Sequence, residues 1–169
     1  MHVIVDAIVW ILPAYFANGA PVLTVHVIRR AGYRPHPLDF GATFTDGRRV
    51  LGDNKSIEGF LGGVAAGTAG GALLQLFGLH DLLSAFVMSI GALTGDLVGA
   101  FIKRRLGLRP GDPAPLLDQL DFVAGSVLAY WLYKPPPLEY VVVVVVLTPL
   151  IHLVTNAVAY VLGIKDRPW

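Results

Sequence analysis

The chain has 169 residues, of which 54% are hydrophobic and only 15% are charged, with a formal net charge of +1. Soluble domains average about 25% charged residues, so this composition favours a single lipid-embedded domain covering residues 1–169. The near-neutral charge argues against a nucleic-acid partner, and the lack of cysteine excludes disulfides and thiolate metal sites.

Five apolar segments are candidates to cross a bilayer as helices, which takes about 20 residues each. In chain order they cover residues 3–27, 57–79, 82–102, 118–133 and 138–162. The last contains a run of valines at 141–146, a composition typical of a strand. An open strand cannot satisfy its backbone in lipid, so we interpret this run as helix. The sequence therefore predicts an all-α integral membrane protein with five transmembrane helices.

Basic residues are distributed unevenly between the two sides of these spans. They lie in the loops 28–56 and 103–117 and in the C-terminal tail, and only Lys134 falls on the other side. Cytoplasmic loops are enriched in Lys and Arg. The pattern predicts a multi-pass protein of the cell membrane, with the N-terminus outside, the C-terminus cytoplasmic and the polar chemistry at the cytoplasmic face.

Glycines recur at four-residue intervals in the second and third spans. They are Gly59, Gly63, Gly67 and Gly71 in one, and Gly91, Gly95 and Gly99 in the other. Small residues on one helix face let two backbones approach closely. We expect these two stripes to form the contact between the second and third spans.

The loop 28–56 is long and mixes acidic with basic residues. Its glycines at 47 and 52 permit tight turns in a backbone that approaches phosphates. The alternative is an ordinary polar connector, but loops of this length are usually functional or disordered. Phe40, Phe44 and Leu51 favour an ordered loop.

A second group of charges spans the end of the third segment and the start of the fourth. Asp96 lies inside an apolar helix, and such a costly residue indicates a functional site, with pairing to an arginine as the alternative. Asp118 and Asp121 lie one turn apart on one helix face. Carboxylates beside substrate phosphates are typical of a Mg²⁺ site. The basic triplet at 103–105 is either a topology anchor or a phosphate-binding group.

These motifs resemble those of membrane CTP:phospholipid cytidylyltransferases. The matching segments are Gly-Asp-Leu-Val-Gly-Ala-Phe-Ile-Lys-Arg-Arg at 95–105 and Leu-Leu-Asp-Gln-Leu-Asp at 116–121. Gln119 and the pair Gly111–Asp112 depart from the bacterial CDP-diacylglycerol synthases. The first loop, with Pro-Leu-Asp-Phe-Gly at 37–41 and Gly-Asp-Asn-Lys-Ser at 52–56, is similar to the CDP-archaeol synthases, as is the ending through residues 165–169.

The resemblance implies a Mg²⁺-dependent transfer of the CMP moiety of CTP to the phosphate of 2,3-bis-O-geranylgeranylglycerol 1-phosphate. The implied catalytic residues are Asp96, Lys103, Asp118 and Asp121, and the three aspartates would hold the metal. The implied nucleotide-binding residues are Asp46, Arg48, Asp53, Asn54, Lys55, Arg104 and Arg105. The implied partners are CTP, an isoprenoid ether lipid phosphate and the bilayer, and a homodimer is permitted.

Three alternatives stay open at this point. The same chemistry could act on diacyl phosphatidic acid. A CDP-alcohol phosphotransferase would show Asp-Gly-x-x-Ala-Arg, but here Asp46 and Gly47 are followed by two arginines and the remaining spacing fails. A non-enzymatic transporter would need polar residues near the middle of the membrane, whereas these charges gather at one end of the spans.

Overall fold

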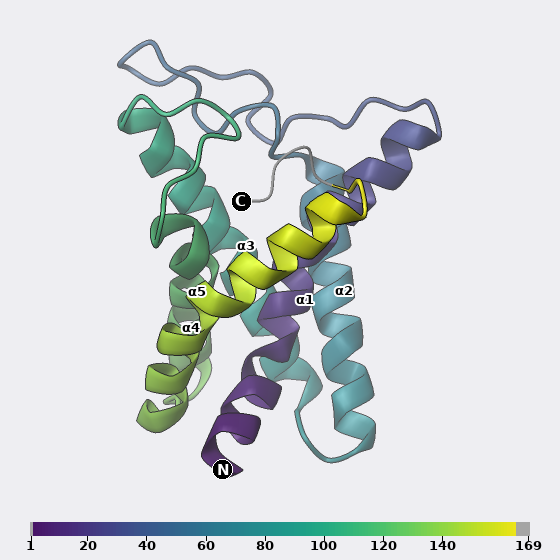
Figure 1. Cartoon of the computed structure of the whole chain (residues 1–169), viewed down its shortest axis with the longest axis vertical. Helices are drawn as coiled ribbons and strands as arrows, with labels where there is room; N and C mark the ends of the chain where they lie inside the picture. The colour runs from purple at the N-terminus through teal and green to yellow at the C-terminus, as the bar shows by residue number, and fades with distance from the viewer. Residues whose placement is uncertain (1, 165–169) are drawn as a thin grey trace.

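The computed structural model describes residues 2–164, and every regular element in that range is a helix. The helices are α1 (His2–Arg30), α2 (Ile57–Leu76), α3 (Leu82–Arg105), α4 (Leu117–Tyr133) and α5 (Leu138–Val161). They form a bundle, with the loops that follow α1 and α3 together at one end (Figure 1). The prediction of an all-helical chain is confirmed for the described residues. The tail 165–169, which entered the topology and the resemblance, lies outside them.

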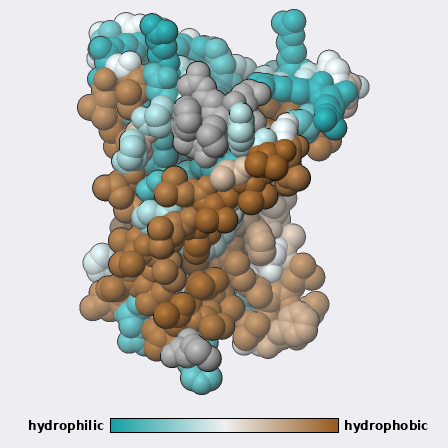
Figure 2. Space-filling view, in the orientation of Figure 1, coloured by the Kyte–Doolittle hydropathy of each residue, from teal (hydrophilic) through white to brown (hydrophobic). Residues whose placement is uncertain are grey.

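Four of the helices described, α1, α2, α3 and α5, are long and apolar enough to cross a membrane. α4 has 17 residues. At 1.5 Å per residue it is about 25 Å long, somewhat less than a hydrocarbon core of about 30 Å. Apolar side chains cover the flank of the bundle, and polar ones gather at the loop end (Figure 2). These features are those of a multi-pass membrane protein.

α5 crosses the bundle obliquely, and the valine run inside it is helical (Figure 1). The Thr148 hydroxyl donates its hydrogen to the Val144 carbonyl, at 2.6 Å. Tyr15 of α1 lies 2.8 Å from the Thr148 oxygen and therefore donates to it. Val144 and Thr148 are fully buried, whereas Leu150, Val154 and Val161 beyond Pro149 are exposed. The first half of α5 is thus the part that packs against the bundle.

The glycines of α2 lie between α1 and α3. A Cβ on Gly63 would approach the Ala17 carbonyl of α1 to 2.7 Å and the Leu93 side chain of α3 to 2.9 Å. A Cβ on Gly67 would come within 2.6 Å of the Pro13 carbonyl. The stripe therefore lets α2 pack tightly against two helices at once, as small residues do in membrane bundles.

The glycines of α3 face α4, so the expectation that the two stripes meet each other is wrong for this set. A Cβ on Gly91 would lie 2.6 Å from the Gly125 carbonyl of α4. A Cβ on Gly95 would lie 3.0 Å from the Gly125 Cα and would overlap the Asp121 carbonyl. The physical reason is that Gly125 supplies the complementary small residue, and its backbone fills the space that the stripe leaves. Both glycine stripes therefore form helix–helix contacts within this one chain.

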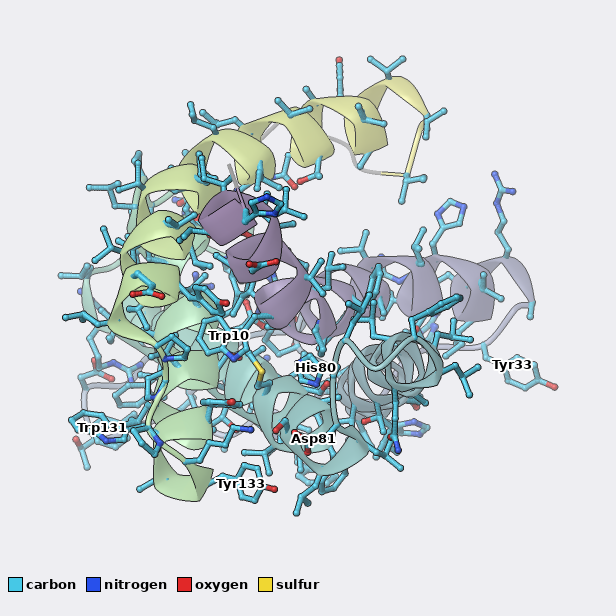
Figure 3. The ribbon with its side chains drawn as sticks, turned by 90° about the horizontal axis from the view of Figure 1, so that it is seen from below. Trp10, Tyr33, His80, Asp81, Trp131 and Tyr133 are labelled. Carbon is cyan, nitrogen blue, oxygen red and sulfur yellow. The ribbon has the colours of Figure 1, made fainter. Side chains whose placement is uncertain are left out.

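The end of the bundle opposite the charged loops is held by polar contacts of the α2–α3 connection (Figure 3). The ring of His80 lies 3.1 Å from the Trp10 carbonyl of α1. Asp81 caps α3 by accepting from the Ser84 backbone N–H at 2.7 Å. Lys134, at the end of α4, lies 3.8 Å from the Asp81 carboxylate. These contacts therefore hold the α2–α3 connection against α1 and the end of α4.

We predict that Gly95→Ala destabilises the bundle, because the new methyl group meets the α4 backbone, which cannot rotate away. The overlap should cost about 2 kcal/mol or more. The readout is a lower thermal midpoint for loss of the folded-protein peak of the detergent-purified protein on size exclusion. Gly19→Ala is the matched control, because a Cβ at that exposed helical position meets no atom within 4 Å. Equal midpoints for the two variants would contradict the prediction.

Candidate active site

A small pocket at the loop end is lined by seven charged or polar side chains and one alanine. The lining residues are Asn54, Lys55, Asp96, Ala100, Lys103, Arg104, Asp118 and Asp121. Its volume is about 40 Å³, which suits an ion or one or two water molecules better than a whole nucleotide. Three separate parts of the chain meet here: the end of the first loop, the last turns of α3 and the first turns of α4.

Helix geometry explains the contribution of α3 and α4. Asp96, Ala100 and Lys103 recur at intervals of four and three residues, so they share one face of α3. Ala100 is a lining residue that charge patterns alone could not find, although its spacing from Asp96 indicates the same face. Asp121 reaches the pocket because α3 carries glycine opposite it. A Cβ on Gly99 would overlap the Asp121 carboxylate and lie 2.9 Å from the Asp121 Cβ.

Two ion pairs occupy the pocket. The Lys55 ammonium donates to both carboxylate oxygens of Asp96, at 2.7 and 2.6 Å. The Lys103 ammonium donates to both oxygens of Asp118, at 2.8 and 3.1 Å. Asp118 also accepts from the backbone N–H of Ala114 at 2.8 Å. Such pairing offsets the cost of placing charges near the membrane, since a buried charge without a partner is strongly destabilising.

Arg104 is the buried cation of the pocket. Only 5% of it is exposed, and its Nε and Nη1 groups have no hydrogen-bond acceptor among the described residues. Leaving a buried donor unpaired costs about 1–3 kcal/mol, so each such group requires an explanation. Guanidinium groups bind phosphate through two parallel hydrogen bonds. The free donors of Arg104 have the chemistry to bind an anionic group in the pocket.

Asp121 differs from the other two acids because no described lysine or arginine pairs with it. Its Oδ1 accepts from the backbone N–H of Phe122 at 2.6 Å. The carboxylate lines the same pocket as Asp96 and Asp118. The structure thus brings all three sequence-predicted aspartates together.

The loop after α1 is closed at its base by backbone hydrogen bonds. The Leu38 N–H donates to the Lys55 carbonyl at 2.8 Å, and the Ile57 N–H donates to the His36 carbonyl at 2.9 Å. Ser56 then caps α2 by accepting from the Gly59 N–H at 3.1 Å. This closure holds Asn54 and Lys55 beside α3, where both line the pocket. Both residues are among those predicted to bind the nucleotide.

The interior of the loop is organised by Asp39, which was not among the predicted site residues. Its buried carboxylate accepts from Arg49 Nη2 at 2.7 Å and from the N–H groups of Leu51 and Gly52 at 3.0 and 3.1 Å. Burial alone would raise the pKa of Asp39, but these hydrogen bonds lower that pKa well below its usual range. Asp39 and Arg49 are ten residues apart, and no local pattern in the sequence indicates the pairing.

Arg48 and Arg105 join this loop to α3. Arg48 Nη1 donates to the Arg104 and Arg105 carbonyls, at 3.1 and 2.6 Å. Arg105 Nη2 donates in return to the Arg49 carbonyl at 2.7 Å. The last carbonyls of a helix lack partners within it, so an arginine from outside is a favourable cap. Gly52 completes the contact, since a Cβ there would lie 3.4 Å from Arg104 Nη1.

Four residues predicted to bind nucleotide are placed outside the pocket: Asp46, Arg48, Asp53 and Arg105. Asp46 pairs with Arg105 Nε at 2.8 Å, and the Arg105 guanidinium stacks on Phe44 and Phe101. Asp53 pairs with Arg49 at 2.6 Å and is 75% exposed. Their contacts fasten the loop, because each finds its partner in the loop or at the end of α3.

Known proteins match the whole chain. A family model described as CarS-like, CDP-archaeol synthase, covers residues 1–169. A CDP-archaeol synthase of Thermofilum pendens is 55% identical over 164 residues, which cover 96% of this chain and 80% of that protein. One of Pyrobaculum calidifontis is 46% identical, with 100% of both chains covered. A solved structure of an intramembrane enzyme for archaeal membrane lipids biosynthesis is 41% identical with a TM-score of 0.79, covering 90% of this chain and 94% of that one.

We predict that Asp39→Asn opens the first loop. The lowered pKa means that the ionised carboxylate stabilises the folded loop at neutral pH, and that this contribution is lost only as pH falls below about 4. Hydrogen bonds to a charged group contribute about 1.5–3 kcal/mol, so tryptic cleavage after Arg48 and Arg49 should accelerate at least about tenfold. Asp53→Asn removes an exposed partner of the same Arg49 and should change cleavage little. Equal cleavage rates for the two variants would contradict the role of Asp39.

Proposed function

The chain belongs to the CDP-archaeol synthase family of cytidylyltransferases, and we propose that it transfers CMP from CTP to 2,3-bis-O-geranylgeranylglycerol 1-phosphate. The products are then the CDP-activated ether lipid and pyrophosphate. The observation that supports this reaction best is the buried Arg104, which has two unpaired donors in a pocket with two lysines and three aspartates. Such a pocket suits a polyphosphate held by cations on one side and by metal-binding oxygens on the other.

The reaction needs no general base in this proposal. An oxygen of the lipid phosphate attacks the α-phosphorus of CTP, and the bond from that phosphorus to the oxygen bridging to the β-phosphorus breaks. The attacking oxygen is already anionic at neutral pH, because the second pKa of a phosphate monoester is about 6. The residues that line the pocket include no histidine, which agrees with this requirement. Catalysis then depends on positioning and on charge neutralisation.

The ion pairs of the pocket suggest how its residues divide the work. Lys55 and Lys103 each hold an aspartate through both carboxylate oxygens. As phosphates enter, each lysine releases its aspartate and donates to a phosphate oxygen. The two ammonium groups then neutralise negative charge on the substrates. Arg104 donates its unpaired N–H groups to the triphosphate. Asn54, at the edge of the same pocket, orients the nucleotide from the loop side.

The same residues fit a Mg²⁺ ion. Mg²⁺ is usually bound by one or two carboxylates together with substrate phosphates and waters. Among the described residues no three acidic or histidine side chains are arranged as a metal site by themselves, so in this proposal the aspartates bind the ion only together with substrate phosphates. Asp96, Asp118 and Asp121 would hold the ion, which would neutralise the triphosphate and orient its reacting phosphorus. The exchange of lysines onto phosphate leaves the oxygens of Asp96 and Asp118 available.

The proposed membrane topology has five spans, with the N-terminus outside and the pocket at the cytoplasmic face. The pocket lies at the end of the bundle that also carries the two basic loops, as the positive-inside rule requires. α4 serves as the fourth and shortest of the five spans, packed along α3. This arrangement gives CTP access from the cytoplasm and leaves the isoprenoid chains in lipid.

The reaction is tested by measuring pyrophosphate release from CTP by the purified protein in detergent. We expect release with the geranylgeranyl ether lipid phosphate and Mg²⁺, little release with diacylglycerol phosphate, and none after chelation of the metal. Equal pyrophosphate release with both lipids would overturn the preference for the ether lipid but would leave the proposed CMP transfer standing. CMP release from a CDP-lipid without consumption of CTP would identify a phosphotransferase instead.

We predict that Arg104→Gln weakens the use of CTP, because Gln lacks the charge that the buried site presents to phosphate. Charge-assisted hydrogen bonds contribute about 1.5–3 kcal/mol, so kcat/KM for CTP should fall by about 10- to 100-fold. Arg109→Gln is the matched control, because that arginine is exposed and does not line the pocket. Unchanged kinetics for Arg104→Gln in correctly folded protein would remove Arg104 from the binding site.

A further inference from the structure

A second hollow lies at the loop end of the bundle, beside the end of α1. Its lining residues are Arg29, Gly32, Tyr33, Arg34, Pro35, Pro37 and Asp53. Its volume is about 720 Å³, and it shares no lining residue with the charged pocket. Figure 1 shows the end of α1 standing away from the other helices, and Figure 3 shows Tyr33 projecting clear of the bundle. We call this hollow the α1 groove.

The α1 groove is positively charged without internal compensation. Arg29, Arg34 and the neighbouring Arg30 are exposed and form no ion pair within residues 2–164. The acid in the groove, Asp53, is already paired with Arg49 at 2.6 Å. By contrast, Arg48, Arg49 and Arg105 are all engaged with the first loop or α3. The groove therefore presents unpaired guanidinium groups to a ligand from outside.

The position of the groove along α1 favours a lipid headgroup as that ligand. α1 is one of the helices able to cross a membrane, and Val27, one turn before Arg30, is 65% exposed. An exposed apolar side chain on a spanning helix faces lipid, so the arginines that follow lie at the level of the headgroups. Arginine reaches that level with its charge while its stem stays on apolar surface. Tyr33, 73% exposed, has the amphipathic ring typical of this interface.

We propose that the α1 groove binds the headgroup phosphate of an anionic membrane phospholipid, at a site distinct from that of the reacting lipid phosphate. Arg29 and Arg34 hold the phosphate, and Tyr33 packs against the headgroup region. The site is coupled to the charged pocket through the chain itself. Asp53 lines the groove, and the next two residues, Asn54 and Lys55, line the pocket. A bound headgroup thus restrains the segment that carries Lys55.

The test is native mass spectrometry of the full chain in detergent with equal amounts of phosphatidylglycerol and phosphatidylcholine. The wild-type protein should retain the anionic lipid preferentially. A basic residue near an anionic surface contributes about 1 kcal/mol, so Arg29→Gln and Arg34→Gln should each lower that preference roughly fivefold. Arg34→Lys keeps the charge and should retain most of the preference. Arg109→Gln, an exposed arginine outside the groove, should leave it unchanged.

Two outcomes would overturn the proposal. The first is an undiminished preference in the double variant Arg29→Gln/Arg34→Gln, with helix content and size-exclusion elution equal to wild type. The second is loss of the retained lipid from wild type on addition of excess inorganic phosphate, which would identify a site for a soluble anion. The measurement uses no CTP, so its result is independent of the proposed reaction.

Discussion

The close approach of α3 to α4 is the constraint on which the functional end of the molecule depends. At Gly95 and Gly125 the two backbones meet with no side chain between them. This contact brings the last turns of α3 against the first turns of α4, so Asp96 and Lys103 face Asp118 and Asp121 across one small pocket. A methyl group at the seam would separate the helices and, with them, Lys103 of α3 from Asp118 of α4. The packing of the helices and the assembly of the pocket therefore share one requirement for small residues.

The first loop adds a second layer that depends on electrostatic pairing instead of apolar packing. Asp39 gathers N–H donors from Arg49, Leu51 and Gly52 and so fixes the fold of the loop from inside. Arg48 and Arg105 then exchange hydrogen bonds with carbonyls of the opposite element. Charged groups near a membrane are tolerated where they are paired, and these are. Arg104 is buried at the pocket and forms no ion pair among the described residues, and two of its donors lack an acceptor there.

The charged pocket and the α1 groove lie at the same end of the bundle and share one short stretch of the loop. Asp53 belongs to the α1 groove, whereas Asn54 and Lys55 belong to the charged pocket. A protein that joins a soluble nucleotide to a membrane lipid needs its polar chemistry at the depth of the headgroups. The arginines at the end of α1 form a positive surface at the same end of the bundle as the pocket. The fold thus combines a close-packed seam between α3 and α4 with a charged end.

Hydropathy and spacing alone predicted the all-helical class, the membrane location and the candidate aspartates, because these properties are local and repeat along the chain, whereas the roles of Lys55 and Lys103 came from the resemblance to the cytidylyltransferases. Hydropathy and spacing correctly grouped Lys55, Asp96, Lys103, Asp118 and Asp121 at one end of the spans. Only the tertiary structure decided that the glycines of α3 meet α4, that Arg104 faces the pocket while Arg105 turns to the loop, and that Asp39 binds Arg49. Adjacent residues on a helix point about 100° apart, and pairs far apart in sequence meet only after packing. The direction in which each charge points therefore depends on contacts between helices, which no local pattern encodes.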